Sequence, residues 1–283
     1  MKGELKDKVA RGVAWSLAEK VGTTLLQLGV RIVLLRLLTT EDFGNMAILT
    51  AISAVVLVVA DSGFSQTLIR RQEPSQRDFK SVFLLNIALS LLLYAALVAL
   101  SPLFAGFFEI PVLRQVAPVF FLVLPLNALC VIQNTIFTRQ FRFALLSKVT
   151  FLASMISGLT AVGLVLAGCG FWSLVIERVL LFSVRAALLW WLSSWRPTGR
   201  FDGRALRQMA PFSCSLMTTD LISAFYNKIP QFFLGKLYSS GTLGSFDQAV
   251  KLKDQPVNSL MQAVQSVTFP ALSKIGDDAP KFA

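Results

Sequence analysis

Polar side chains recur at helical spacing inside some of the most apolar stretches of the sequence. Lys20, Thr24, Gln27 and Arg31 are separated by four, three and four residues, so they share one face of a helix. Two further stripes follow the same rule: Arg178 and Arg185, with Glu177 beside the first, and Asp220, Ser223, Asn227 and Gln231, with Lys228 beside the third. A charge at the bilayer centre costs roughly 2.5–3.5 kcal/mol, so such residues usually face a bundle interior or a water-filled cavity.

The signs of these charges indicate what such a cavity would accept. The cations of the three stripes outnumber the anions, which are Glu19, Glu177 and Asp220. Arginine binds phosphate oxygens in pairs and lysine acts as a point charge, so the expected substrate is anionic and strongly polar. Its candidate binding residues are Lys20, Gln27, Arg31, Arg178, Arg185, Asn227 and Lys228. Asp220, near the middle of its apolar stretch, is the candidate carboxylate for a coupling ion.

A purely structural explanation of the same charges is also open. Buried charges tend to find partners, so Glu19 could pair with Lys20 or Arg31, Glu177 with Arg178, and Asp220 with Lys228. Complete pairing of the three anions would still leave a surplus of cations in these helices.

Few residues of the sequence fit catalysis. Histidine is absent, which excludes catalytic triads with an imidazole base and metal sites with an imidazole ligand. Cys130, Cys169 and Cys214 lie far apart and are interpreted as small apolar residues. The paired acids at 41–42 and 277–278 are typical of a turn and a tail. We therefore expect no enzymatic activity, no metal and no cofactor.

The composition is that of a membrane protein. Of 283 residues, 54% are apolar and only 15% are charged, and the mean hydropathy is +0.64. These values exclude a disordered chain, a nucleic-acid-binding tail and an ordinary cytosolic domain. The apolar stretches that could cross a membrane lie at 12–38, 44–66, 81–107, 115–136, 146–168, 171–194, 208–235 and 244–270. The predicted fold is an all-α, polytopic membrane helical bundle with about eight transmembrane helices.

The distribution of lysine and arginine predicts the orientation. Basic residues gather at the N-terminus, in the loops 67–80, 137–148 and 195–207, and in the tail, whereas the opposite side has only Arg114 and Lys236. By the positive-inside rule, both ends of the chain should be cytoplasmic. The net charge of +11 is therefore attributed to insertion and to contact with membrane lipids, and no nucleic-acid partner is expected. Tryptophans 172, 190, 191 and 195 are expected to form an interfacial belt.

Two turns that lie 200 residues apart resemble each other. Residues 34–44 and 234–244 each contain the end of a helix, a hydroxyl-rich turn and a glycine at the start of the next helix. Transporters are commonly built from internal repeats, although short turns can also converge on similar residues. A repeat predicts a six-helix lobe at 1–195, a basic cytoplasmic linker at 196–207 and the first two helices of an incomplete second lobe at 208–283. We therefore expect a truncated chain.

Four segments together resemble a known family. In chain order they are 37–44 (LLTTEDFG), 61–65 (DSGFS), 170–175 (GFWSLV) and 269–275 (FPALSKI). The sequence is similar to the bacterial polysaccharide transporter, or oligosaccharide flippase, family of the Wzx type, and most similar to its colanic-acid-exporter-like branch. This family belongs to the superfamily of multidrug, oligosaccharidyl-lipid and polysaccharide flippases.

The resemblance implies a transporter of the bacterial inner membrane. Its substrate would be an undecaprenyl-pyrophosphate-linked oligosaccharide, moved to the periplasmic leaflet by alternating access through a central cavity. Polysaccharide polymerase machinery is an implied partner. The family fold also implies roughly a dozen helices in two lobes, and this sequence has mostly the first lobe.

Three alternatives stay open at this point. A drug or metabolite exporter of the same superfamily should favour acidic and aromatic contacts, which the cationic surplus disfavours. A membrane glycosyltransferase would need an acidic metal-binding or general-base cluster at a membrane face. A fragment that does not transport is compatible with the missing second half.

Overall fold

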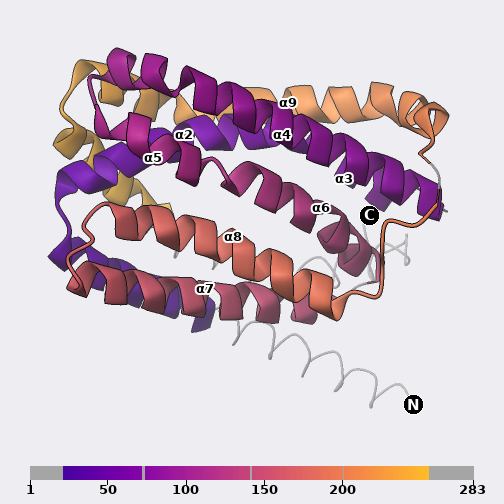
Figure 1. The fold of residues 1–283 in the computed structure, drawn as a ribbon, viewed down its shortest axis with the longest axis horizontal. Helices are drawn as coiled ribbons and strands as arrows, with labels where there is room; N and C mark the ends of the chain where they lie inside the picture. Colours follow the sequence, from indigo (N-terminus) through magenta and orange to yellow (C-terminus); the bar gives the residue numbers. More distant parts are fainter. Residues whose placement is uncertain (1–21, 72–73, 141, 200, 255–283) are drawn as a thin grey trace, which may run out of the picture.

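The protein is an all-α bundle in a computed structural model that describes residues 22–71, 74–140, 142–199 and 201–254. The long helices run side by side along the longest axis of the molecule, and their connections lie at two opposite ends (Figure 1). In chain order the elements are a helical segment at 22–37, α2 (Thr40–Asp61), α3 (Phe64–Arg70), α4 (Gln76–Phe108), α5 (Val112–Phe120), α6 (Val123–Arg139), α7 (Phe143–Leu166), α8 (Trp172–Leu192), α9 (Gly203–Leu237) and a helical segment at 240–254.

The two ends of the bundle differ in charge. We call the end at which α4, α7 and α9 begin the basic end, because it carries most of the described lysines and arginines outside the helix interiors. The opposite end, with the connections 38–39, 109–111, 167–171 and 238–239, is called the short-turn end.

The helices confirm the predicted class of fold, a polytopic membrane helical bundle. Each predicted span coincides with a helix or a pair of helices, within the part of the chain that is described. Four described spans are long and apolar enough to cross a bilayer: Thr40–Asp61, Gln76–Phe108, Val112–Arg139 and Phe143–Leu166. Helices α8 and α9 carry charged residues well inside their lengths, at Glu177, Arg178 and Arg185 and at Asp220 and Lys228.

Two of the predicted spans are interrupted. The first break separates α2 from α3 at Ser62 and Gly63, which both adopt left-handed backbone conformations with φ of 54° and 68°. A Cβ atom on Gly63 would lie 2.5 Å from the Ser213 carbonyl oxygen of α9, so glycine also permits a close approach here. The second break, between α5 and α6, lies just before Pro125, whose ring has no N–H to continue the ladder.

Local hydrogen bonds define several helix starts. Thr39 and Asp42 form a capping box at α2, in which the Thr39 hydroxyl accepts from the Asp42 N–H at 3.2 Å and the Thr39 N–H donates to the Asp42 carboxylate at 3.1 Å. Ser75 and Asp78 repeat this arrangement at α4. At the start of 240–254, the Ser239 hydroxyl accepts from the Thr242 N–H at 3.3 Å.

The Thr39 cap provides a first test of the structure. Thr39→Ala removes the acceptor for one N–H of the first turn of α2, which should cost about 1 kcal/mol of stability. The expected result is a fall of a few degrees in the thermal unfolding midpoint of the purified protein in detergent, followed by tryptophan fluorescence. Thr160→Ala is the control, because the exposed Thr160 hydroxyl bonds only a carbonyl of its own helix. Equal midpoints for the two variants would contradict the capping role.

Two glycines allow α2 and the segment 240–254 to pack backbone against backbone at the short-turn end. A Cβ atom on Gly44 would collide with the carbonyl group of Ser240, and one on Gly244 would collide with the carbonyl group of Thr40. The two contacts are reciprocal: position 44 meets position 240, and position 244 meets position 40, each 200 residues apart from its counterpart. The interface of a two-fold dimer has the same reciprocity. The two similar turns of the sequence therefore lie against each other.

The segment between α8 and α9 is attached to the first turns of α4. Trp195 Nε1 donates to Gln76 Oε1 at 2.7 Å, and Lys80 Nζ donates to the Gly199 carbonyl oxygen at 2.6 Å. The backbone N–H of Asp202, the N-cap of α9, donates to Ser81 Oγ at 2.7 Å.

The predicted interfacial belt of tryptophans is wrong for Trp195. Its side chain is buried, 7% exposed, and packs with ring centroids 6.5 Å from Phe79 and 5.8 Å from Phe83. Trp191, by contrast, is 80% exposed. The indole of Trp195 therefore stabilises the core at the basic end instead of facing lipid.

Candidate functional site

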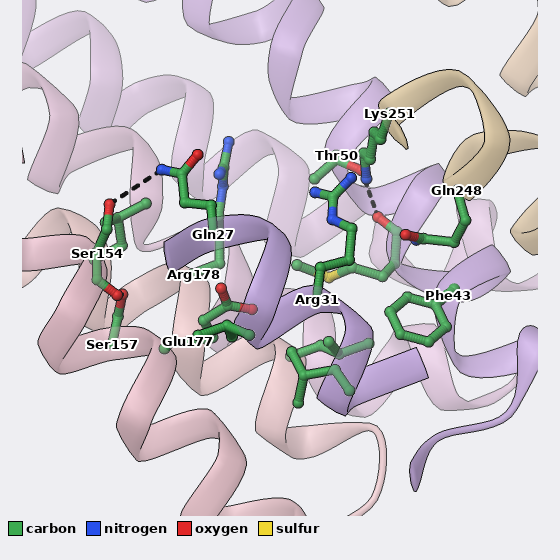
Figure 2. A pocket seen from close by; sticks show the side chains of 16 residues that line it. Gln27, Arg31, Phe43, Thr50, Ser154, Ser157, Glu177, Arg178, Gln248 and Lys251 are labelled. Carbon is green, nitrogen blue, oxygen red and sulfur yellow. Dashed lines mark hydrogen bonds between the residues drawn. The ribbon is translucent and has the colours of Figure 1, made fainter. Parts of the chain in front are cut away.

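A polar pocket lies inside the bundle, where the first and last described helices meet α2, α7 and α8. It encloses about 190 Å³ and is lined by side chains of 22–37, α2, α7, α8 and 240–254, which converge in Figure 2. At 1.5 Å per residue, Arg31 lies about 9 Å from the end of its helix, and Glu177 is a similar distance into α8. The pocket therefore lies between the middle of the bundle and the short-turn end.

Three cations and one carboxylate line this pocket. The cations are Arg31, Arg178 and Lys251, and the carboxylate is Glu177. Neither arginine forms an ion pair with a carboxylate among the described residues, and Nη1 of Arg31 is buried without a hydrogen-bond partner there. The Arg178 guanidinium lies over the Phe182 ring, 5.4 Å from its centroid. The pocket thus keeps a net positive charge.

Lys251 is the cation of the pocket that has an ion-pair partner. Its Nζ lies 2.6 Å from Oδ2 of Asp247, one turn earlier on the same helix, and Asp247 is only 3% exposed. Because Asp247 does not line the pocket, the carboxylate fixes Lys251 from behind while the lysine faces the cavity.

Uncharged polar groups complete the lining. Gln27 Nε2 donates to Ser154 Oγ at 3.2 Å, which links the first described helix to α7 (Figure 2). The Gln248 side chain is buried, and its Oε1 has no hydrogen-bond partner among the described residues. An unpaired guanidinium donor and an unpaired amide acceptor are both costly to bury, so the pocket is suited to a polar, hydrogen-bonding ligand or to water.

Only some of the binding residues that were predicted from the sequence line the pocket. Gln27, Arg31 and Arg178 line it, whereas Lys20 lies outside the described residues. Arg185 lies two turns further along α8, and its Nη2 is 3.4 Å from Asn134 Oδ1 of α6. Asp220, Asn227 and Lys228 lie on α9 and do not line the pocket.

Asp220 has a partner other than the predicted one. Its carboxylate accepts a hydrogen bond from Gln66 Nε2 of α3 at 3.1 Å, and it forms no ion pair with Lys228. Glu177 and Arg178 likewise do not form an ion pair, because neighbouring side chains on a helix point about 100° apart. Asp61 accepts from Ser65 Oγ at 2.7 Å and so acts locally at the α2–α3 break.

Lys251 and Gln248 are among the lining residues that sequence reasoning missed. The available signal was a charged pair, Asp247 and Lys251, spaced by four residues within the last predicted span. Such a pair is also typical of an exposed helix surface, so spacing alone could not place it in the pocket.

Comparison with known proteins decides the family. A family model described as "Polysaccharide biosynthesis protein" matches residues 33–283, which is most of the chain. The chain belongs to this polysaccharide biosynthesis family. Family membership confirms the resemblance to Wzx-type flippases that the four sequence segments indicated.

Curated members of the family agree with this assignment. The chain is 25% identical over 273 residues to the teichuronic acid biosynthesis protein TuaB of Bacillus subtilis, covering 94% of this chain and 56% of TuaB. It is 23% identical to the succinoglycan biosynthesis transport protein ExoT of Rhizobium meliloti, covering 95% and 55% of the two chains. It is 24% identical to the lipopolysaccharide biosynthesis protein WzxC of Escherichia coli, covering 98% and 57%.

These relatives are longer proteins than this chain. The chain spans slightly more than half the length of each of them. No solved structure matches the chain. The comparisons therefore show that the chain belongs to a family of polysaccharide biosynthesis proteins.

Proposed function

We propose that the protein moves a lipid-linked oligosaccharide across the bacterial inner membrane by alternating access, as a transporter and not as an enzyme. The observation that carries this proposal is the net positive, partly unpaired pocket inside a membrane bundle of this family. A lipid-linked glycan has an acidic phosphate-bearing head, while its polyprenyl tail can stay in the lipid. Only the head requires a polar path through the bundle.

The pocket residues have distinct roles in this proposal. Arg31 and Arg178 bind phosphate oxygens through charge-assisted hydrogen bonds, and Lys251 adds a point charge. Gln27 and Gln248 offer amide groups to sugar hydroxyls next to the phosphate. A volume of about 190 Å³ equals roughly six water molecules at ~30 Å³ each, so it fits a pyrophosphate group rather than a whole sugar repeat unit. The glycan must therefore extend beyond this pocket, or the pocket must widen around it.

The remaining predicted features belong to the same proposal. Arg185 extends the cationic path toward the basic end, and Asn227 and Lys228 extend it along α9. Asp220 is the proposed coupling-ion carboxylate, with Gln66 as its neighbour. The basic end faces the cytoplasm. The proposed organisation is one lobe at 1–195, a linker at 196–207 and the start of a second lobe at 208–283, with an undecaprenyl-pyrophosphate-linked glycan as substrate and polysaccharide polymerase machinery as a partner.

The test is to mutate the gene in the source organism so that the protein loses two positive charges of the pocket. The Arg31→Gln and Arg178→Gln double variant should reduce surface polysaccharide about tenfold or more, because each charge-assisted hydrogen bond contributes roughly 1.5–3 kcal/mol and 1.4 kcal/mol is a factor of ten. Lipid-linked oligosaccharide should accumulate in the cytoplasmic leaflet. Surface polysaccharide is measured per cell, and membrane levels of the protein are measured by immunoblot.

The matched control is the Arg204→Gln and Arg207→Gln double variant. It removes the same charge from two exposed positions near the start of α9, outside the pocket. Normal export in the control with lost export in the pocket variant supports the proposal. Normal export in both, at equal membrane levels, would refute it.

A further inference from the structure

An apolar groove lies on the surface of the bundle near the short-turn end, where α4 and α9 run side by side and α2 contacts both (Figure 1). It has a volume of about 360 Å³, which is within the range of about 300–1,000 Å³ typical of small-molecule sites. Its lining residues are all apolar, and most of them are phenylalanines: Ile52, Leu103, Phe104, Phe107, Phe108 and Phe232. The groove therefore suits a hydrocarbon chain better than a polar molecule.

The groove extends along the axis of the bundle. At 1.5 Å per residue, Leu103 and Phe232 each lie about 8 Å from the short-turn ends of α4 and α9, whereas Ile52 lies about 18 Å along α2 from the same end. Deeper on α9 the aromatic surface continues, because Phe225 stacks on Phe232 with ring centroids 6.3 Å apart. Leu103 and Phe107 are 66% and 54% exposed, so the groove is open to the surroundings of the bundle. An acyl chain that enters the bilayer at the short-turn end would run in this direction.

A lysine and a glutamate lie at the outer end of the groove. Lys236 is in the last turn of α9, and its Nζ lies over the Phe107 ring, 5.0 Å from the centroid. The same Nζ donates to the Phe107 carbonyl oxygen at 2.8 Å and to Oε1 of Glu109 at 3.2 Å. The site thus has one positive and one negative group, side by side, at the level where α4 and α9 end.

Both charged groups can still bind a ligand. An ammonium group has three N–H donors, and Lys236 donates two of them to described residues. The Glu109 side chain is 82% exposed, and its Oε2 accepts no hydrogen bond from a described residue. An exposed ion pair is weak, so a ligand can compete for either partner. A donor and a carboxylate arranged in this way are complementary to a headgroup that carries a phosphate and an ammonium group.

We propose that the groove and the Lys236–Glu109 pair together bind phosphatidylethanolamine from the leaflet at the short-turn end. One acyl chain lies against the phenylalanines, the phosphate accepts a hydrogen bond from Lys236, and the primary ammonium of ethanolamine donates to Glu109. The proposal concerns a bound membrane lipid and does not depend on transport through the pocket of Arg31 and Arg178.

Native mass spectrometry of the purified full protein tests the headgroup with three lipids that have the same acyl chains. Phosphatidylethanolamine should bind about threefold or more tightly than the other two, because one exposed charge contact is gained. Phosphatidylcholine has a quaternary ammonium without an N–H, and phosphatidylglycerol has no cationic group. If either binds as tightly as phosphatidylethanolamine, the proposed recognition by Lys236 and Glu109 is wrong.

Two matched pairs of variants test the two parts of the site. Glu109→Gln should abolish the preference for phosphatidylethanolamine, whereas Glu41→Gln, at an exposed carboxylate of the same end but outside the groove, should keep it. Leu103→Ala should weaken phosphatidylethanolamine binding about threefold or more, because it removes apolar contact area from the groove. Leu159→Ala removes a leucine of α7 that is similarly exposed, at 60%, and should leave the affinity unchanged. A preference that survives in Glu109→Gln, or equal losses in the two leucine variants, would overturn the proposal.

Discussion

Replacing Gly44 by alanine should lower the thermal unfolding midpoint of the purified protein by about 2–12 °C. The new Cβ would collide with the backbone carbonyl of Ser240, and a backbone atom cannot rotate aside as a side chain does. Overpacking typically costs about 1–3 kcal/mol, and each kcal/mol shifts the midpoint of a chain of this size by roughly 2–4 °C. Differential scanning fluorimetry or fluorescence-detected gel filtration after heating measures the shift.

The chain offers a matched control for this substitution. Gly163 lies inside α7, and a Cβ atom there meets nothing within 4 Å. Gly163→Ala should therefore leave the midpoint unchanged or raise it, because alanine favours a helix by roughly 0.5–1 kcal/mol. Gly244→Ala should reproduce the effect of Gly44→Ala, since the contact is reciprocal. The double variant should cost less than the sum, because one separation of the helices accommodates both methyl groups. Similar midpoints for Gly44→Ala and Gly163→Ala would contradict the close backbone packing of α2 against the segment 240–254.

Asp247→Asn should destabilise the protein by about 3 kcal/mol. The substitution leaves Lys251 without its partner at 2.6 Å. The Lys251 side chain is 33% exposed, so the cost should lie at or below the lower end of the roughly 3–5 kcal/mol that removing one member of a fully buried ion pair costs. Lys251→Met should cost a similar amount, because Asp247 then has no counter-charge. The double variant with both substitutions should recover most of the loss. Denaturant unfolding in a fixed detergent provides the four free energies of this cycle.

The exposed pair of Lys253 and Asp254 is the control for that cycle. Its nitrogen and oxygen lie 3.2 Å apart, but the two side chains are 72% and 46% exposed. Asp254→Asn should therefore change the stability by less than about 1 kcal/mol. A coupling energy for Asp247 and Lys251 no larger than that of the exposed pair would show that the buried pair does not anchor the lysine.

The helical spans were largely predictable from the sequence, although the predicted starts at 44 and 81 lie four and five residues inside α2 and α4. Long apolar stretches determine where a chain can cross a membrane, and capping residues such as Thr39 and Ser75 indicate where helices begin. The break at Ser62 and Gly63 was harder to predict, because the apolar pattern continues across it. It depends on the close approach of α9, which is a tertiary contact.

The pocket was predictable only in part, for a similar reason. The spacing of Gln27 and Arg31 identifies a shared helix face, and α8 contributes Arg178. Periodicity assigns residues to faces of single helices, but it does not determine which faces meet. Arg185 and Asp220 share the polar stripes and nevertheless lie against Asn134 and Gln66. Lys251 lines the pocket because its helix packs against α2. No local sequence pattern indicates this packing.

The attachment of residues 195–202 to α4 has a mechanical consequence. The sequence predicted a basic linker at 196–207, and the hydrogen bonds of Trp195, Gly199 and Asp202 hold residues 195–202 against the start of α4. The first turns of α4 and α9 must therefore move together. Any swing of α9 relative to the rest of the bundle has to pivot further along its length, where Pro211 and Pro230 weaken the helix.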